Sequence, residues 1–206
     1  NIISMAKNQL IGPDAFGSSY GGQSGLRGAK LQAVTRIYTV YQARCRQANA
    51  MDFDDILVNT FRLLNENADI RNKYADRFQY ILVDEYQDTN SVQVAIVKLL
   101  TVKHQRVCVV GDDYQSIYSF RGANIDNILD YQKKFDNVQV FKLERNYRST
   151  QKIVEAANSL MKHNVKQIPK EVYSKESEGS KISYHSCYSD KEEAMVVVKE
   201  IKKLHR

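Results

Sequence analysis

The chain has 206 residues, of which 43% are hydrophobic and 26% are charged. These fractions are ordinary for a folded globular protein, and they exclude a disordered, collagen-like or disulfide-dense chain. No apolar run approaches the roughly 18 residues of a membrane helix, and the first residues lack the layout of a signal peptide. We therefore expect a soluble, cytoplasmic protein that makes no contact with a membrane.

Charge is distributed unevenly along the chain. Residues 1–50 carry six basic and one acidic side chain, residues 51–143 carry 11 and 14, and residues 144–206 carry 13 and nine. An acidic centre between basic segments makes the centre the place to search for a metal or phosphate site. The three cysteines and four histidines show neither a disulfide framework nor zinc-ligand spacing.

The sequence as far as Leu64 has the pattern of helices, with one interruption. Residues 17–28 are rich in Gly and Ser and predict a flexible loop. Apolar residues at helical spacing predict a helix over about residues 29–48. The acidic run Asp52 to Asp55 predicts the start of a further helix, because carboxylates stabilise a helix N-terminus.

From Tyr80 the pattern changes to that of an α/β protein. Residues 80–83 and 107–110 are short continuous apolar runs, which are typical of buried parallel strands, and the apolar spacing between them predicts a crossover helix. Val138, Val140 and Leu143 predict a third strand, after a helix near residues 125–135. Further along, the sequence predicts a helix from about Ser149 with Ser149 or Thr150 as its N-cap, a strand over residues 182–187 and a helix over residues 192–204. The fold class expected is α/β: a partial RecA-like parallel sheet flanked by helices, with a helical piece at the N-terminus.

Acidic residues follow the two central strands directly. Asp84 and Glu85 leave the first strand, and Gly111, Asp112 and Asp113 leave the second. Ligands of open α/β sheets bind at the carboxyl ends of the strands, so these side chains point to a site. Two adjacent carboxylates there suit a Walker B arrangement, in which one holds magnesium and the other activates a water. The alternative is that the acids only solvate the strand ends.

Three segments in this region resemble consecutive motifs of superfamily 1 helicases of the UvrD, PcrA and Rep type. They are residues 83–90 (VDEYQDTN), 110–123 (VGDDYQSIYSFRGA) and 143–150 (LERNYRST). Their order and spacing match the family as well. Residues 51–57 (MDFDDIL) and the stretch around residues 4–8 (SMAKN) are also similar, so the resemblance covers nearly the whole chain.

The resemblance implies roles in ATP hydrolysis for five residues. Asp84 would bind Mg²⁺, and Glu85 would be the general base for attack of water on the γ-phosphate. Gln115 would sense that phosphate, unless it only ties down its own loop. Tyr147 would stack on the adenine, and Arg148 would reach the γ-phosphate from a second motor domain, where an arginine can contribute roughly 10³ to 10⁵ in rate. For Arg148 the alternative is an ion pair with a surface acid.

The same resemblance implies a grip on single-stranded DNA. Tyr118, Phe120 and Arg121 form an aromatic and cationic cluster beside Gln115, in a segment that the family uses to hold DNA. Stacking of a base on an aromatic ring contributes roughly 1 to 3 kcal/mol and tolerates any sequence. Phe120 stands where the family commonly has Trp. The alternative is that Tyr118 and Phe120 belong to the core.

The P-loop that normally cradles ATP phosphates is not found. It requires Gly-Lys before Ser or Thr, and none of the nine glycines is followed by Lys. We therefore expect an internal fragment of a helicase: part of an inserted helical subdomain (residues 1–50), part of the first RecA-like motor domain (51–143) and the start of the second (144–206). This chain alone should have negligible ATPase activity, and its exposed sheet edges favour self-association.

The function expected of the parent protein is that of an ATP-dependent DNA helicase and translocase. By resemblance it moves 3′ to 5′ on single-stranded DNA, acts at junctions with duplex DNA and serves DNA repair or replication. Two alternatives remain at this stage. One is part of a nuclease-linked recombination helicase, and the other is a non-enzymatic module that binds nucleic acid or protein on a helicase scaffold.

Overall fold

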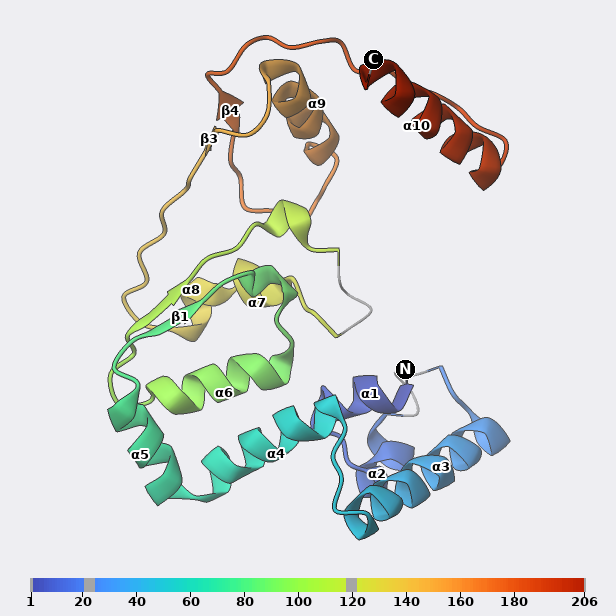
Figure 1. The fold of residues 1–206 in the computed structure, drawn as a ribbon. Helices are drawn as coiled ribbons and strands as arrows, with labels where there is room; N and C mark the ends of the chain where they lie inside the picture. The colour runs from blue at the N-terminus through green and yellow to red at the C-terminus, as the bar shows by residue number, and fades with distance from the viewer. Residues whose placement is uncertain (1, 21–24, 118–121, 206) are drawn as a thin grey trace. The chain divides into compact units, whose positions relative to one another are not determined.

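The computed structural model describes residues 2–20, 25–117 and 122–205 (Figure 1). Its contacts divide the chain into two units, Asn1–Val140 and Phe141–Arg206. Each unit has its own helices and its own pair of parallel strands. None of the helices in the described ranges is long and apolar enough to cross a membrane.

The first unit begins with helices around a small aromatic core. They are α1 (Ile2–Lys7), α2 (Pro13–Ala15), the π-helical turn η1 (Phe16–Tyr20) and α3 (Gly28–Gln47). The predicted helix over residues 29–48 is confirmed as α3. The predicted loop is wrong for residues 17–20, because burial of Phe16 and Tyr20 against Tyr38 winds that segment into a turn. Residues 21–24 lie outside the described part of the chain.

Two helices follow, α4 (Phe53–Glu66) and α5 (Ala68–Arg77). The predicted start of α4 is confirmed, and its cap is reciprocal. The Asp52 carboxylate accepts a hydrogen bond from the Asp55 amide (2.7 Å), and the Asp55 carboxylate accepts one from the Asp52 amide (3.3 Å). This capping box satisfies two amides that an uncapped helix start leaves without partners.

The centre of the first unit is a parallel βαβ arrangement. Strand β1 (Ile81–Val83) pairs with β2 (Val107–Val109) in the register Ile81↔Val107, and α6 (Ser91–Thr101) connects them. Both strands and the crossover helix are confirmed. Helix α6 packs against α4 and α5 (Figure 1). Its N-cap Asn90 forms a second capping box with Gln93.

The region after β2 differs from the prediction in two places. The helix expected near residues 125–135 is split into α7 (Asp126–Leu129) and α8 (Tyr131–Lys134), because Asp130 leaves the helical backbone conformation. The third strand predicted from Val138, Val140 and Leu143 is wrong. Residues 137–144 are all described and form no strand. Leu143 is 88% exposed, because no neighbouring strand covers the apolar side chains of this segment.

The second unit contains β3 (Arg145–Asn146), α9 (Gln151–Met161), β4 (Tyr173–Ser174) and α10 (Asp190–Leu204). Thr150 is the N-cap of α9, but its side chain accepts no cap hydrogen bond. The first amides of α9 donate instead to the carbonyls of Ser177 and Glu178.

Of two predictions for residues 182–204, one is confirmed and one is wrong. The helix expected over residues 192–204 is confirmed as α10, and the Ser189 side chain caps it. The strand predicted over residues 182–187 is wrong. These residues are described and make no ladder, and Ile182 and Tyr184 are exposed, so they lack the partner strand that would bury them.

Candidate functional site

The carboxyl ends of β1 and β2 meet at one edge of the sheet. Because the strands are parallel and paired in register, the residues after Val83 and Val109 leave side by side. The Val110 amide donates to the Val83 carbonyl (2.8 Å), and the Tyr86 amide donates to the Val110 carbonyl (3.0 Å). These bonds continue the pairing beyond the strands and hold the two acidic segments together.

Asp84 and Glu85 form a sharp turn at the end of β1. Glu85 has a left-handed backbone conformation (φ 49°, ψ 42°) and leads into a 3₁₀ turn, η2 (Tyr86–Asp88). Its amide donates to the Asp84 carboxylate (2.9 Å). A non-glycine residue held in this region costs of order 1–3 kcal/mol, and such strain clusters at functional sites. Both carboxylates are exposed and open to a ligand.

A chain of hydrogen bonds joins Glu85 to the segment after β2. The Gln87 side-chain amide donates to Glu85 Oε2 (2.7 Å), and its Oε1 accepts from the Asp112 amide (3.0 Å). The Asp112 carboxylate then accepts from Gln115 Nε2 (2.8 Å). The structure thus brings the sequence-predicted Glu85 and Gln115 to the same edge of the sheet, through Asp112, which the sequence also placed there, and through Gln87, which was not predicted.

Gln115 lies in a second 3₁₀ turn, η3 (Asp113–Gln115), which Asp112 caps through its bond from the Tyr114 amide (3.1 Å). The side chain of Gln115 is exposed, and its amide is bonded within its own turn. The hydrogen bond to Asp112 thus holds the Gln115 side chain against its own turn. An exposed amide whose partner is a surface carboxylate remains accessible to a ligand.

The remaining predicted residues fall in two places. Tyr118, Phe120 and Arg121 lie outside the described residues. Tyr147 and Arg148 belong to the second unit, directly after β3, and both are exposed. There the Asn146 side chain accepts from the amides of Arg148 (2.9 Å) and Ser149 (2.8 Å), and the guanidinium of Arg145 lies 4.4 Å from the ring centroid of Tyr147.

Sequence reasoning missed the residues that connect the site. Gln87 lies inside the segment that carries the resemblance, two residues after Glu85, but its partner Asp112 is 25 residues away. Asn8 and Asn90 form a similar link between side chains, because Asn90 Nδ2 donates to Asn8 Oδ1 (2.8 Å) and Asn8 Nδ2 donates to Asp54 Oδ1 (2.9 Å). The position of these residues beside recognised motif residues could have marked them as candidates. Which of them pair with each other follows only from the fold.

A buried ion cluster lies beside this asparagine link. The Lys7 ammonium is 2.6 Å from Asp52 and 2.8 Å from Asp55, and 5.1 Å from the ring centroid of Tyr41. Burial acts to lower the pKa of Lys7, but hydrogen bonds to Asp52 and Asp55 outweigh it and raise the pKa. Burial likewise acts to raise the pKa of Asp52, and the bonds from Lys7 and Tyr41 lower it on balance. The cluster joins α1 to the start of α4.

The residues after β1 suit a magnesium ion that arrives with phosphate. In the described ranges, no three His, Cys, Asp or Glu side chains are placed to hold a metal by themselves. Asp84 has one carboxylate oxygen bonded to the Glu85 amide, and no described residue donates to the other. Mg²⁺ commonly takes one or two protein carboxylates and fills its other positions with waters and substrate phosphates. The single exposed carboxylate of Asp84 fits that requirement.

Parallel strands with acidic carboxyl ends and a crossover helix form an α/β unit, which is consistent with part of a RecA-like fold. Two family models match the chain: the UvrD/REP helicase N-terminal domain over residues 1–136 and the UvrD-like helicase C-terminal domain over residues 141–206. The chain therefore belongs to the UvrD/REP helicase family.

Similar proteins include ATP-dependent DNA helicases named PcrA. The protein of Bacillus subtilis (strain 168) is 41% identical over 203 residues, which cover 98% of this chain and 27% of the relative. That of Leuconostoc citreum is 37% identical over 203 residues, covering 98% of this chain and 26% of the relative. The chain thus spans about a quarter of the length of the curated relatives it matches.

Proposed function

We propose that this chain supplies the hydrolysis machinery of an ATP-dependent DNA helicase and translocase. The observation that carries the proposal is the hydrogen-bonded set Glu85–Gln87–Asp112–Gln115 at the ends of β1 and β2, in a member of the UvrD/REP helicase family. A coherent set of this kind is needed for hydrolysis, whereas a module that only binds a partner does not need it. No observation favours that alternative.

The proposed reaction is hydrolysis of the terminal phosphoanhydride of ATP. A water attacks the γ-phosphorus, the bond from that phosphorus to the bridging oxygen breaks, and ADP leaves. Glu85 accepts the proton of the water, because its carboxylate is exposed at the strand end and Gln87 orients one oxygen. Gln115 bonds the γ-phosphate or the water in place of Asp112 once the nucleotide is bound.

Asp84 would hold Mg²⁺ through its open carboxylate oxygen. The ion would neutralise negative charge on the ATP phosphates. From the second unit, Tyr147 offers an exposed ring for the adenine, and Arg148 offers a guanidinium for the γ-phosphate. The short Asn146 turn sets the backbone of both residues.

The proposed partner is single-stranded DNA, including its junctions with duplex DNA, with Tyr118, Phe120 and Arg121 as the contact residues. The assignment of these three rests on the motif they occupy. Movement would be 3′ to 5′, in DNA repair or replication, and the protein would act in the cytoplasm.

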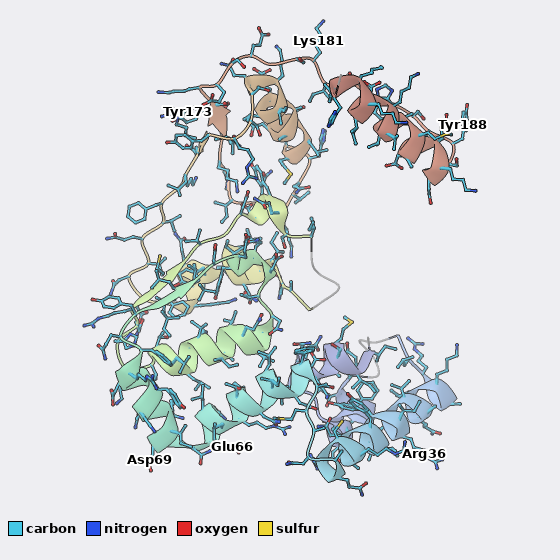
Figure 2. All side chains as sticks on the ribbon, in the orientation of Figure 1. Arg36, Glu66, Asp69, Tyr173, Lys181 and Tyr188 are labelled. Atoms are coloured by element: carbon cyan, nitrogen blue, oxygen red, sulfur yellow. The ribbon has the colours of Figure 1, made fainter. Side chains whose placement is uncertain are left out.

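The test uses the product of the complete reading frame that encodes these residues. Phosphate release is measured with and without single-stranded DNA, for the wild type and for Glu85→Gln. We expect DNA-stimulated release in the wild type and a loss of roughly 10²- to 10⁴-fold in kcat for Glu85→Gln, the usual contribution of a general base. The matched control is Glu66→Gln, an exposed glutamate at the end of α4 (Figure 2), which should leave kcat unchanged.

Two outcomes would contradict the proposal. Wild-type protein that releases no phosphate in the presence of DNA would favour the binding module, and unchanged turnover in Glu85→Gln would remove Glu85 from the reaction. Direction is tested separately with duplexes that carry a 3′ or a 5′ single-stranded tail. Unwinding of the 3′-tailed duplex alone is the expected result.

A further inference from the structure

Gln87 is the most enclosed member of the hydrogen-bonded set at the strand ends. Gln87 is 1% exposed, whereas Glu85 and Gln115, at the two ends of the set, are exposed. A buried polar side chain must satisfy its hydrogen-bonding groups within the protein. Gln87 satisfies both groups of its amide on the two acidic segments, one on each.

The two bonds fix the orientation of the amide. The Nε2 group donates to the Glu85 carboxylate, which can only accept, and Oε1 accepts from the Asp112 amide, which can only donate. A flipped amide would place donor against donor and acceptor against acceptor. Gln87 therefore has a single satisfied arrangement, and that arrangement sets the distance between the turn after β1 and the turn after β2.

Gly111 closes the space around the Gln87 amide. A Cβ added at Gly111 would lie 2.6 Å from Gln87 Oε1, 2.8 Å from Ile128 Cδ1 and 3.2 Å from the Tyr86 amide nitrogen. The backbone after β2 thus passes directly over the amide, and the side chain cannot move toward it. There is no room on that side for a larger residue than glycine.

We infer that Gln87 is a positioning residue for ATP hydrolysis, which holds the general base Glu85 and the phosphate-sensing turn Asp112–Gln115 in one fixed relation. A change at the γ-phosphate that moves Gln115 is passed through Asp112 and Gln87 to the carboxylate of Glu85. Base and sensor are then set together and do not move independently. The inference rests on the proposed function, because it assigns Glu85 and Gln115 their roles in hydrolysis.

The first experiment compares steady-state ATP hydrolysis of Gln87→Glu and Gln87→Met with the wild type, in the product of the complete reading frame with single-stranded DNA. Gln87→Glu keeps the size and the acceptor for Asp112 but replaces the donor to Glu85 with a like charge. Gln87→Met keeps the length and loses both groups. We expect kcat to fall roughly 10- to 100-fold in both, as for other residues that orient a catalytic group, with KM for ATP changed less than about twofold.

The matched control is Gln93→Met. Gln93 is also a glutamine with a bonded side chain, but it caps α6 and makes no bond to the strand ends. It should lower stability without lowering kcat selectively. Parallel losses in kcat for Gln93→Met and Gln87→Met would mean that Gln87 only supports the fold, and would overturn the inference.

The double variant Gln87→Met with Gln115→Ala tests the connection itself. If the two residues act through one chain of bonds, the second substitution adds little to the first, so the double variant loses less than the product of the two single losses. Losses in kcat that multiply fully would show that base and sensor are independent, and would overturn the inference.

A second experiment needs no activity. In the 206-residue chain, hydrogen exchange of the Asp112 amide is followed by NMR, because that amide donates to Gln87 Oε1. Exchange should accelerate about tenfold or more in Gln87→Met and stay unchanged in Gln93→Met. Unchanged exchange in Gln87→Met would overturn the inference. Accelerated exchange in a protein that hydrolyses no ATP would preserve the connection between the turns while the proposed function fails.

Discussion

At the residue scale, the motif around Glu85 contains a tyrosine whose ring and hydroxyl have opposite effects on stability. Tyr86 is fully buried, and its ring packs edge-on against Tyr131 with centroids 5.4 Å apart. Burial raises the pKa of Tyr86 to about 12. Its hydroxyl oxygen is buried and finds no hydrogen-bond partner in the part of the chain that the structure describes. The ring therefore stabilises the turn, and the hydroxyl opposes that stabilisation.

Tyr86→Phe should for this reason leave the protein as stable as the wild type or more stable. A buried hydroxyl without a partner costs about 1–3 kcal/mol, and the substitution removes it while keeping the ring. Urea-induced unfolding followed by circular dichroism measures the change. The matched control is Tyr38→Phe, because the buried Tyr38 hydroxyl donates to the Ile11 carbonyl (3.0 Å) and its loss should cost about 1 kcal/mol. Equal losses in the two variants would contradict the prediction.

The sequence indicates which residues gather at the site but not how they are connected. Asp84 and Glu85 follow an apolar run, and strand-end geometry alone places them beside the segment that begins at Gly111. The contact between Gln87 and Asp112 depends on a turn with Glu85 in the left-handed region and on a glycine that makes room for an amide. Neither condition is visible in local composition or periodicity, so the connection had to come from the structure.

At the element scale, a charged cluster joins α1 to the start of α4. Lys7 is 3% exposed and bonds two carboxylates at the capping box that starts α4, and Tyr41 of α3 donates to one of them (2.7 Å). Ion pairs that are this enclosed are strongly destabilising to break from one side, because the partner charge is left buried. The cluster makes the attachment of the N-terminal helices depend on pH.

The direction of that dependence follows from the two pKa shifts. The pKa of Asp52 is lowered in the folded chain. The contribution of Asp52 to stability is therefore complete above the pKa of the unfolded chain, about 4, and is lost as pH falls through the pKa of the folded chain. The pKa of Lys7 is raised, so its contribution is complete below its unfolded value, about 10.4, and is lost as pH rises through the folded value. The cluster is therefore fully stabilising between about pH 4 and pH 10.

Asp52→Asn should lower the thermal unfolding midpoint at pH 7, and the difference from the wild type should shrink at pH 3. Asn keeps a helix cap and a side chain of the same size, so the variant removes mainly the charge. The control is Asp69→Asn, an exposed acid in the first turn of α5 (Figure 2), which should change the midpoint little at either pH. A difference for Asp52→Asn that is the same at pH 3 and pH 7 would show that its charge contributes nothing.

Most of the longer helices were predictable from the sequence, although α5 was not and the helix near residues 125–135 is split, and strands were predictable only in part, for a physical reason. The bonds of α4 lie within one segment, and its cap is visible in Asp52 and Asp55. A strand needs a partner elsewhere, and pattern does not say whether one is present. Residues 81–83 pair with residues 107–109, whereas residues 138–143 pair with no strand among the described residues. The short strands that pair Arg145 with Tyr173 have no apolar pattern from which they could be predicted.

At the scale of the whole molecule, the central sheet is small for the apolar surface it carries. In the described residues it has two strands, so β1 and β2 each have one unpaired edge. Leu82 at the middle of β1 is 76% exposed, and Val110 just after β2 is 56% exposed. A two-stranded parallel sheet with an open apolar face is marginally stable in water, and unpaired edges accept strands from other chains.

The 206-residue chain should therefore associate with itself through the sheet. Sedimentation velocity over a range of concentrations should show species larger than the monomer, and Leu82→Lys should shift them toward the monomer, because a charged side chain on the open face must be desolvated on contact. Leu204→Lys is the control, since it adds the same charge to an exposed leucine of α10, outside the sheet. If Leu204→Lys disperses the chain as well as Leu82→Lys does, the association is a general effect of exposed apolar residues. A wild type that sediments as a monomer at all concentrations would mean that the open face of β1 and β2 is stable in water, and the sheet would then need no further strand to complete it.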